Sequence, residues 1–279
     1  MKSVYRLLVW LNTAVSIIVI IAGVSVTYHA GGVNNLIGGG VVRQLSASNC
    51  VYLKELQHYN NNLTVKLYSH RFAEIDSIHK IVVLGNSITR ARMRKDIGWI
   101  SDYGMAASSI DNDFCHVVKR ALAENNPEIE IIPYNISPWE QNFSIDKDSL
   151  FGNVFDNTDV VIVRLGENVP ADSIGHFDVG LRSLLDYIAL KTSAQVIMTG
   201  CFWTNWQKDT NIRKVAAERD FPFISLAYLD IDANKALGGG EATDTLGNVY
   251  HFNGEFVGSH PNDQGMKAIA DALLPLFTN

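Results

Sequence analysis

From residue 81 to the C-terminus, short apolar runs alternate with longer segments whose apolar residues recur every three or four positions. The short runs are typical of buried strands and the longer segments of amphipathic helices. The expected strands are residues 81–84, 130–133, 159–163, 195–199 and 223–226, and the expected helices are residues 109–124, 181–189, 211–219 and 266–273. This order favours an α/β fold with a parallel sheet covered by helices on both faces. Ligands of such sheets bind at the carboxyl ends of the strands.

The N-terminus is the most hydrophobic part of the chain. Lys2 and Arg6 precede an apolar run over residues 7–26, and a helix of that length spans about 30 Å, enough to cross the hydrocarbon core of a membrane. A basic start followed by such a run indicates a signal peptide or an uncleaved signal-anchor. Cleavage after Ala30 would place the bulky Tyr28 where a small residue is needed, which favours the anchor. In both cases we expect export to the cell envelope or periplasm, either membrane-anchored or secreted.

Three segments follow from these patterns. Residues 1–30 form the signal peptide or membrane anchor, residues 31–78 a linker with a small N-terminal extension, and residues 79–279 one α/β domain. Glycine and asparagine triplets interrupt the second segment, in which residues 64–68 alternate as a short strand does. Roughly 250 residues remain after the N-terminal segment, enough for one large buried core.

The charge pattern gives no sign of a nucleic-acid partner. The net charge is -6, and the one dense basic cluster is Arg90, Arg92, Arg94 and Lys95. A short cluster of this kind is typical of a solvated helix face. Because no wider basic surface accompanies it, we do not expect nucleic acid to bind.

The cysteines do not indicate a metal site. Cys50, Cys115 and Cys201 are far apart and form no CxxC pair, so zinc is not expected, and no metal or organic cofactor is implied. Cys115 and Cys201 lie in apolar stretches and are expected to be buried as small hydrophobic side chains. A disulfide from Cys50 to either of them stays open.

A serine follows the first expected strand directly. In Gly85-Asn86-Ser87 the hydroxyl would lie at the edge of the sheet, and a helix starting near Arg90 would direct backbone N–H groups and a partial positive charge toward it. These features suit a nucleophile next to which an oxyanion develops. The alternative is a serine that caps the helix.

Three further residues could complete such a site. His260 precedes Pro261, which favours extended geometry just before the last helix, so its imidazole can serve as the base for Ser87. Gly104 lies in a loop where the backbone can approach a ligand, and Asn168 follows the third strand with an amide donor. Each of the three also has an ordinary interpretation as a surface, capping or turn residue.

Ser87, Gly104, Asn168 and His260, in this chain order, resemble the four blocks of the SGNH subgroup of the GDSL esterase/lipase family. The resemblance spans residues 81–279. It implies a flavodoxin-like, five-stranded α/β/α sandwich and a carboxylic ester hydrolase. The serine attacks the acyl carbonyl, the histidine is the base, and the Ser87 N–H, the Gly104 N–H and the Asn168 side chain bind the oxyanion.

The sequence departs from the family at two positions. Asn86 replaces the usual aspartate before the serine, which we expect to require a structural adjustment without loss of activity. Val257 stands where the aspartate of the catalytic triad usually lies, so either a backbone carbonyl orients His260 in a Ser–His dyad or another carboxylate does. Glu255 and Asp263 are the nearby candidates, although Asp263 is also expected to cap the last helix.

The substrate is open within the family. Trp139, Trp203 and Trp206 lie near strand ends, where they could stack on sugar rings or pack over the sheet edge. Together with export, they favour an esterase that removes acyl groups, chiefly O-acetyl groups, from carbohydrates. Lysophospholipase or thioesterase activity is one alternative, and a non-catalytic envelope protein that binds sugars at a degenerate site is another. Residues 235–258 are expected to form a long loop leading to His260, and the oligomeric state does not follow from the sequence.

Overall fold

The computed structural model describes residues 47–68 and 75–277. The N-terminal apolar run, and with it the predicted signal peptide or anchor, lies outside these residues. No helix in the part of the chain described is both long and apolar enough to cross a membrane. Asn61–Asn279 forms one compact unit, and the domain boundary at residue 79 stays a prediction.

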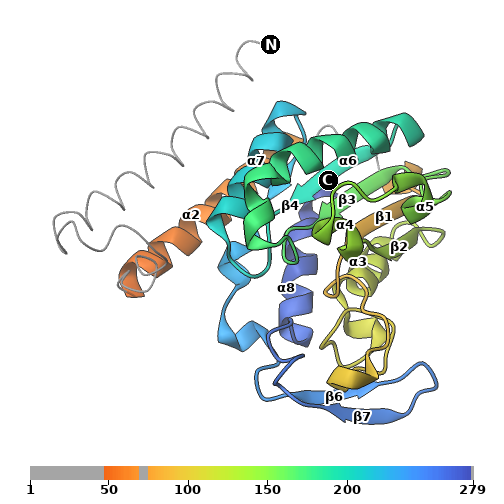
Figure 1. Ribbon diagram of the computed structural model, residues 1–279, viewed down its shortest axis with the longest axis vertical. Coiled ribbons are helices and arrows are strands. Elements are labelled where there is room, and N and C mark those ends of the chain that lie inside the picture. Colours follow the sequence, from red (N-terminus) through yellow and green to blue (C-terminus); the bar gives the residue numbers. More distant parts are fainter. Residues whose placement is uncertain (1–46, 69–74, 278–279) are drawn as a thin grey trace. The chain divides into compact units, whose positions relative to one another are not determined.

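Five parallel strands form the central sheet (Figure 1). They are β1 (Lys80–Gly85), β2 (Glu130–Asn135), β3 (Val160–Arg164), β4 (Gln195–Thr199) and β5 (Phe223–Ile224). Their spatial order is β2-β1-β3-β4-β5, with Ile81 paired to Ile131 on one side and to Val160 on the other. This order is the flavodoxin-like one, so the predicted fold class is confirmed.

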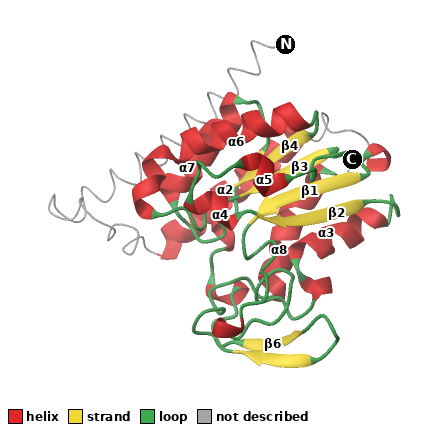
Figure 2. Ribbon diagram, turned by 45° about the vertical axis from the view of Figure 1, so that its right-hand side comes forward, coloured by secondary structure: helices red, strands yellow, loops and turns green. Residues whose placement is uncertain are grey.

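Helices cover both faces of the sheet (Figure 2). The helices α3 (Phe114–Ala123) and α8 (Asp263–Leu273) pack against one face, and α6 (Phe177–Lys191) and α7 (Trp206–Glu218) against the other. Successive residues of β1 belong to opposite cores: Ile81 and Val83 pack on the α3 and α8 side, and Val82 and Leu84 on the α6 and α7 side. A parallel strand buried on both faces reads as a continuous apolar run, which is why the sequence revealed these strands. The short helices α4 (Ser137–Gln141) and α5 (Lys147–Phe151) follow β2.

The predicted helix at residues 90–95 is wrong. The Thr89 and Arg90 N–H groups both donate to Asn86 O, and the chain then leaves the turn without forming a helix. The Arg94 N–H donates to Trp99 O instead of to a carbonyl four residues earlier. The Ala91 N–H likewise donates to Tyr103 O, at 2.9 Å. Carbonyls outside the helical register therefore accept the hydrogen bonds of the Ala91 and Arg94 N–H groups.

Two more expectations are corrected. Residues 64–68 belong to the helix α2 (Ala47–Tyr68), in which Val65 and Tyr68, three positions apart, pack on the core. The Asn61 side chain on α2 fixes this part of the helix by exchanging two hydrogen bonds with the Ser225 backbone, at 2.8 and 2.9 Å. The expected long loop at residues 235–258 contains an antiparallel hairpin of β6 (Gly240–Thr243) and β7 (Val249–Phe252).

Asp263 does not cap α8. Asn262 is the N-cap residue, and its side chain accepts from the Gly265 N–H at 2.9 Å. The Asp263 carboxylate instead accepts from the Ser108 N–H and hydroxyl, at 2.7 and 2.6 Å, and from the Asn112 amide at 3.0 Å. It therefore connects the start of α8 to the loop that precedes α3.

We expect Asp263→Ala to lower the free energy of unfolding by about 1–3 kcal/mol, because three partly buried donors lose their acceptor. Asp271→Ala is the matched control. It removes a carboxylate from the same helix, and this carboxylate bonds, within the part of the chain described, to the exposed Lys267, so a loss of at most about 0.5 kcal/mol is expected. Urea unfolding of both variants measures the difference, and equal losses would contradict the role given to Asp263.

Candidate active site

Ser87 lies in a tight turn at the carboxyl end of β1. The turn requires glycine at position 85, because a Cβ there would lie 1.9 Å from Thr89 Oγ1. The Ser87 carbonyl accepts from the Met105 N–H at 2.9 Å, which fixes the turn to the next loop. The helix expected to begin beside the serine is not formed at residues 90–94, so it supplies no N-terminus to Ser87.

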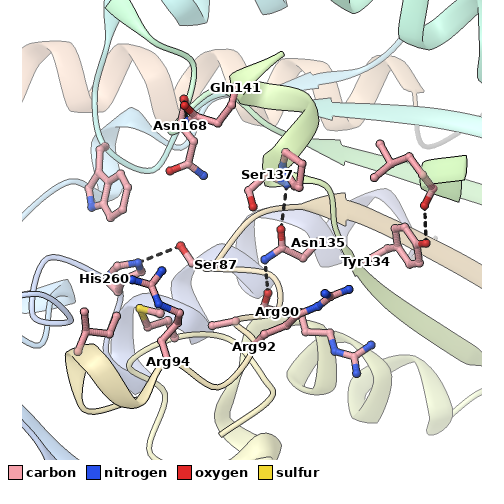
Figure 3. Close-up of a pocket in the computed structure, with 16 residues that line it drawn as sticks. Ser87, Arg90, Arg92, Arg94, Tyr134, Asn135, Ser137, Gln141, Asn168 and His260 are labelled. Atoms are coloured by element: carbon pink, nitrogen blue, oxygen red, sulfur yellow. Dashed lines mark hydrogen bonds between the residues drawn. The ribbon is translucent and has the colours of Figure 1, made fainter. Parts of the chain in front are cut away.

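The structure brings Ser87 and His260 together. His260 lies in the loop before α8 and is only 7% exposed, and its Nε2 is 2.9 Å from Ser87 Oγ (Figure 3). Its Nδ1 is 3.0 Å from the Val257 carbonyl oxygen. Because a carbonyl only accepts hydrogen bonds, Nδ1 carries the proton of the neutral ring and Nε2 accepts from the serine hydroxyl.

Neither candidate acid contacts His260. Glu255 has an exposed side chain, and Asp263 is bonded to Ser108 and Asn112. The Val257 side chain is fully buried in the core and its carbonyl takes the place of a carboxylate oxygen. Of the two arrangements that the sequence left open, the structure therefore has the one with a backbone carbonyl.

The His260 imidazole is held in its neutral form. Burial lowers its pKa to about 4, and the positive charge of Arg164 acts in the same direction. The hydrogen bond to Val257 and the negative charge of Glu167 raise the pKa but do not outweigh burial. A neutral imidazole is what a general base requires near pH 7.

The three tryptophans have different surroundings. Trp203 lines the pocket. Its ring is nearly perpendicular to the His260 imidazole, with 5.0 Å between the ring centroids, and its Nε1–H donates to Ser259 O at 2.7 Å. It therefore supports the loop that contains Ser259 and His260. Trp139 is fully buried, and Trp206 is exposed at the start of α7 and does not line the pocket. Only Trp203 is placed to touch a ligand of this pocket.

Packing explains why position 104 is a glycine. A Cβ at this position would lie 2.7 Å from Ile88 O, so no side chain fits. Its N–H donates to the buried Asp113 carboxylate at 3.3 Å, and its neighbour Met105 lines the pocket instead. The role of Gly104 as an oxyanion donor stays a prediction.

Asn168 reaches the pocket from the loop after β3. One N–H of its amide donates to Glu140 Oε2 at 2.8 Å, which fixes the orientation of the side chain. An amide nitrogen has two N–H groups, so the second is left for a ligand. Glu140 also accepts from the Gly166 N–H at 2.6 Å, so it holds the loop after β3 at two positions, Gly166 and Asn168.

A buried polar cluster lies beneath the site, and the sequence reasoning missed it. Arg164, at the end of β3, donates to Glu167 Oε1 at 2.8 Å and to Asn86 Oδ1 at 2.9 Å. The Asn86 amide donates to Glu167 at 2.7 Å and to Glu140 at 3.3 Å. The sequence signal for this cluster is an arginine at the end of the apolar run of residues 160–163, followed three positions later by a glutamate.

The cluster gives a physical reason for Asn86. An aspartate there would face the carboxylates of Glu140 and Glu167 and could donate to neither of them. Burial, and secondly the charge of Glu167, raise the pKa of Glu140 to about 7. A third ionised carboxylate, at position 86, would add to the repulsion between Glu140 and Glu167. The Asn86 amide carries no charge and donates a hydrogen bond to each of them.

Ser87 and His260 open into a pocket of about 690 Å³. Figure 3 shows Asn168 and Gln141 on one side of it and Arg90, Arg92 and Arg94 on the other. Three residues of the basic cluster therefore border the site. Arg92, Arg94 and Lys95 are exposed, as expected, but no α-helix is formed there, so the interpretation as a helix face is wrong. Within residues 47–68 and 75–277, no group of three or more metal-binding side chains is present.

The two cysteines in the described core are ordinary packing residues. Cys115 and Cys201 are buried free thiols, as the sequence predicted, and neither forms a disulfide. Burial raises the pKa of both thiols, so neither is an activated nucleophile. The side chain of Cys50 lies outside the part of the structure described.

Comparison with known proteins finds similar folds only. No protein family model and no curated sequence matches the chain. Solved structures that resemble it include a two-domain esterase active on acetylated mannans, co-crystallised with mannopentaose, at 17% identity and a TM-score of 0.44. Another is a family two carbohydrate esterase from Cellvibrio japonicus, at 16% identity and a TM-score of 0.38.

Each match covers part of this chain and part of the other protein. The first covers 77% of this chain and 52% of the mannan esterase, and the second covers 71% of this chain and 59% of the Cellvibrio enzyme. The chain thus spans about half the length of the two-domain esterase. Likeness at this level carries no argument about activity, so the function has to be argued from the site itself.

Proposed function

We propose that this chain is a serine esterase that hydrolyses acyl esters, chiefly O-acetyl esters of carbohydrates. The observation that carries the proposal is the hydrogen-bonded series from Ser87 Oγ to His260 Nε2, and from His260 Nδ1 to the Val257 carbonyl. A serine and a neutral imidazole in this order form a nucleophile with its base.

Hydrolysis proceeds in two halves. Ser87 Oγ attacks the ester carbonyl carbon while His260 Nε2 takes the hydroxyl proton, and the imidazolium then gives that proton to the departing alcohol. Water next attacks the acyl-serine and loses a proton to His260 Nε2. The imidazolium then gives this proton to Ser87 Oγ as the acyl–oxygen bond breaks, which yields the acid and the free serine. The Val257 carbonyl keeps the proton on Nδ1 throughout and stabilises the imidazolium by a hydrogen bond.

Of the three predicted oxyanion donors, Gly104 has its N–H directed at Asp113, and the other two have an N–H left for the oxyanion. The Ser87 N–H bonds to no acceptor among the described residues, and the Asn168 amide has one N–H beyond the one that Glu140 occupies. Donors fixed before the reaction stabilise developing charge without reorganising. Glu140 therefore acts as a positioning residue for Asn168.

The lining of the pocket is mixed. Hydroxyl and amide side chains line it, including those of Asn135, Ser137 and Gln141, and so do the apolar side chains of Ile97, Met105 and Leu150. Sugar hydroxyls bond to the polar groups, and these groups, with the Trp203 ring beside the histidine, favour a carbohydrate ester. The lysophospholipase and thioesterase alternatives stay open, because the apolar side chains can contact an acyl chain. Export to the envelope, through the N-terminal segment, remains part of the proposal on sequence grounds.

Ser87→Ala should lower kcat/KM for a short-chain acetyl ester by about 10³-fold or more, because the nucleophile is removed. His260→Ala should cost a similar factor, since an unassisted serine hydroxyl is a weak nucleophile. Initial rates with p-nitrophenyl acetate measure both. His116→Ala is the matched control, because that histidine bonds to Asp113 away from the pocket. A rate unchanged by Ser87→Ala would favour the non-catalytic sugar-binding alternative.

On the acid side, kcat/KM should fall with an inflection near pH 4 and not near pH 6.5. The base works only when neutral, and the lowered pKa of His260 keeps it neutral down to about 4, so activity is present above that pH and is lost as the pH falls through it. Far-UV circular dichroism at each pH separates protonation from unfolding. An inflection at about 6.5, the ordinary value for histidine, would contradict the lowering of the His260 pKa by burial.

Asn168→Ala should lower kcat by about 10²–10³-fold, because a donor to the oxyanion is lost. Steady-state kinetics with p-nitrophenyl acetate separate this effect from KM, which should change little. Asn135→Ala is the comparison, because its amide lines the same pocket but donates to Arg90 O. A loss of at most about threefold for Asn168→Ala would remove it from the oxyanion site.

A further inference from the structure

The charge of the pocket differs in sign from the charge of the protein. The chain carries a net charge of -6, yet Arg90, Arg92 and Arg94 line the pocket that contains Ser87, and no aspartate or glutamate is among the described residues that line it. The three arginines come from one segment, which follows the Ser87 turn and has no regular secondary structure up to Met93. This segment brings three guanidinium groups to the same side of the pocket, as Figure 3 shows.

Two of these guanidinium groups have internal partners. Arg90 donates to both oxygens of Asp102, at 3.0 and 2.6 Å, and Arg94 to both oxygens of Asp96, at 2.8 and 2.6 Å. Each pair uses two of the five N–H donors of a guanidinium. Both pairs are exposed by more than a third, so they contribute little stability and leave further N–H groups for a ligand.

Arg92 has no such partner. Its guanidinium makes no hydrogen bond or ion pair with any residue in the described part of the chain, and it is exposed at the pocket. An arginine presents a planar fork of donors that matches a carboxylate, phosphate or sulfate group. One uncompensated cation, next to two others that retain free donors, makes this side of the pocket suited to an anion.

We propose that the natural substrate is an acyl ester of an anionic glycan, whose carboxylate or sulfate group binds to Arg92 with Arg90 and Arg94 beside it. This inference rests on the proposed esterase function and adds the charge of its substrate. The ester lies at Ser87 while the anionic group of the same or a neighbouring sugar contacts the arginine side of the pocket shown in Figure 3. Neutral glycans would lack this contact and bind more weakly.

Binding without turnover tests the proposal separately from the esterase function. The Ser87→Ala protein is titrated by calorimetry with three unacylated oligosaccharides of matched length: an oligogalacturonide, a sulfated oligosaccharide and a neutral manno-oligosaccharide. We expect at least one anionic oligosaccharide to bind about tenfold or more tightly than the neutral one at low salt. This preference should shrink as the ionic strength rises from about 0.02 M to about 0.5 M. The carboxylate and sulfate arms identify which anion the pocket takes.

Charge variants assign the preference to the pocket. In the Ser87→Ala background, Arg92→Gln should weaken binding of the preferred anionic oligosaccharide by about three- to tenfold. Lys95→Gln is the matched control: it removes one charge from the same basic cluster at an exposed residue that does not line the pocket, and a change below about twofold is expected.

Three results would overturn the proposal: equal affinity for the neutral and both anionic oligosaccharides, no measurable binding of either anionic one, or equal effects of Arg92→Gln and Lys95→Gln. Hydrolysis of p-nitrophenyl acetate by the protein with Ser87 intact would stand in each case. The esterase function and the anionic substrate therefore fail on different measurements.

Discussion

The site depends on one hydrogen bond between residues that are 173 positions apart, from Ser87 to His260. Neither side chain has a distinctive chemistry alone, because a serine hydroxyl is a weak nucleophile and a lone histidine is a common surface residue. The parallel sheet makes their meeting possible, since it places the turn after β1 beside the loop that leads into α8. Burial then keeps the imidazole neutral, and Val257 decides which nitrogen carries the proton. The carbonyl performs the orienting part of an aspartate without placing a negative charge on the ring, so its hydrogen bond does not outweigh the lowering of the pKa by burial.

Below this pair, a buried polar cluster determines how the donors of the site are held. Arg164 is fully buried, and its charge is balanced by Glu167 and by the Asn86 carbonyl oxygen. Glu140 holds the Asn168 amide and the Gly166 N–H at the end of β3. Such a cluster is costly to bury and tolerates few substitutions, because each member satisfies another. It also accounts for the departure at Asn86, where an amide can serve both carboxylates and an arginine at once.

The sequence was informative where one physical signal dominated. The apolar runs at residues 81–84, 159–163 and 195–199 identified β1, β3 and β4 to within one residue at either end, because strands buried on both faces need apolar residues at every position. The helices were identified by their spacing, but their first residues were not. The helix α3 begins at Phe114 rather than at 109, since the Asp113 side chain caps it by accepting from the His116 N–H. The helices α6 and α7 begin four and five residues before the expected positions 181 and 211. The loop after Ser87 was mistaken for a helix because tertiary partners such as Tyr103 and Trp99 take its backbone hydrogen bonds. Local spacing contains no information about such partners, nor about the contacts of Glu140 or the position of Arg92 at the pocket.

Covalent labelling of Ser87 by a fluorophosphonate tests the central claim most directly, because the reagent reacts with a serine that an adjacent base activates. Mass spectrometry of the labelled and digested protein at neutral pH should find one adduct, on Ser87, formed much more slowly in His260→Ala. Failure of the folded protein to label at Ser87, or labelling that does not depend on His260, would contradict the account.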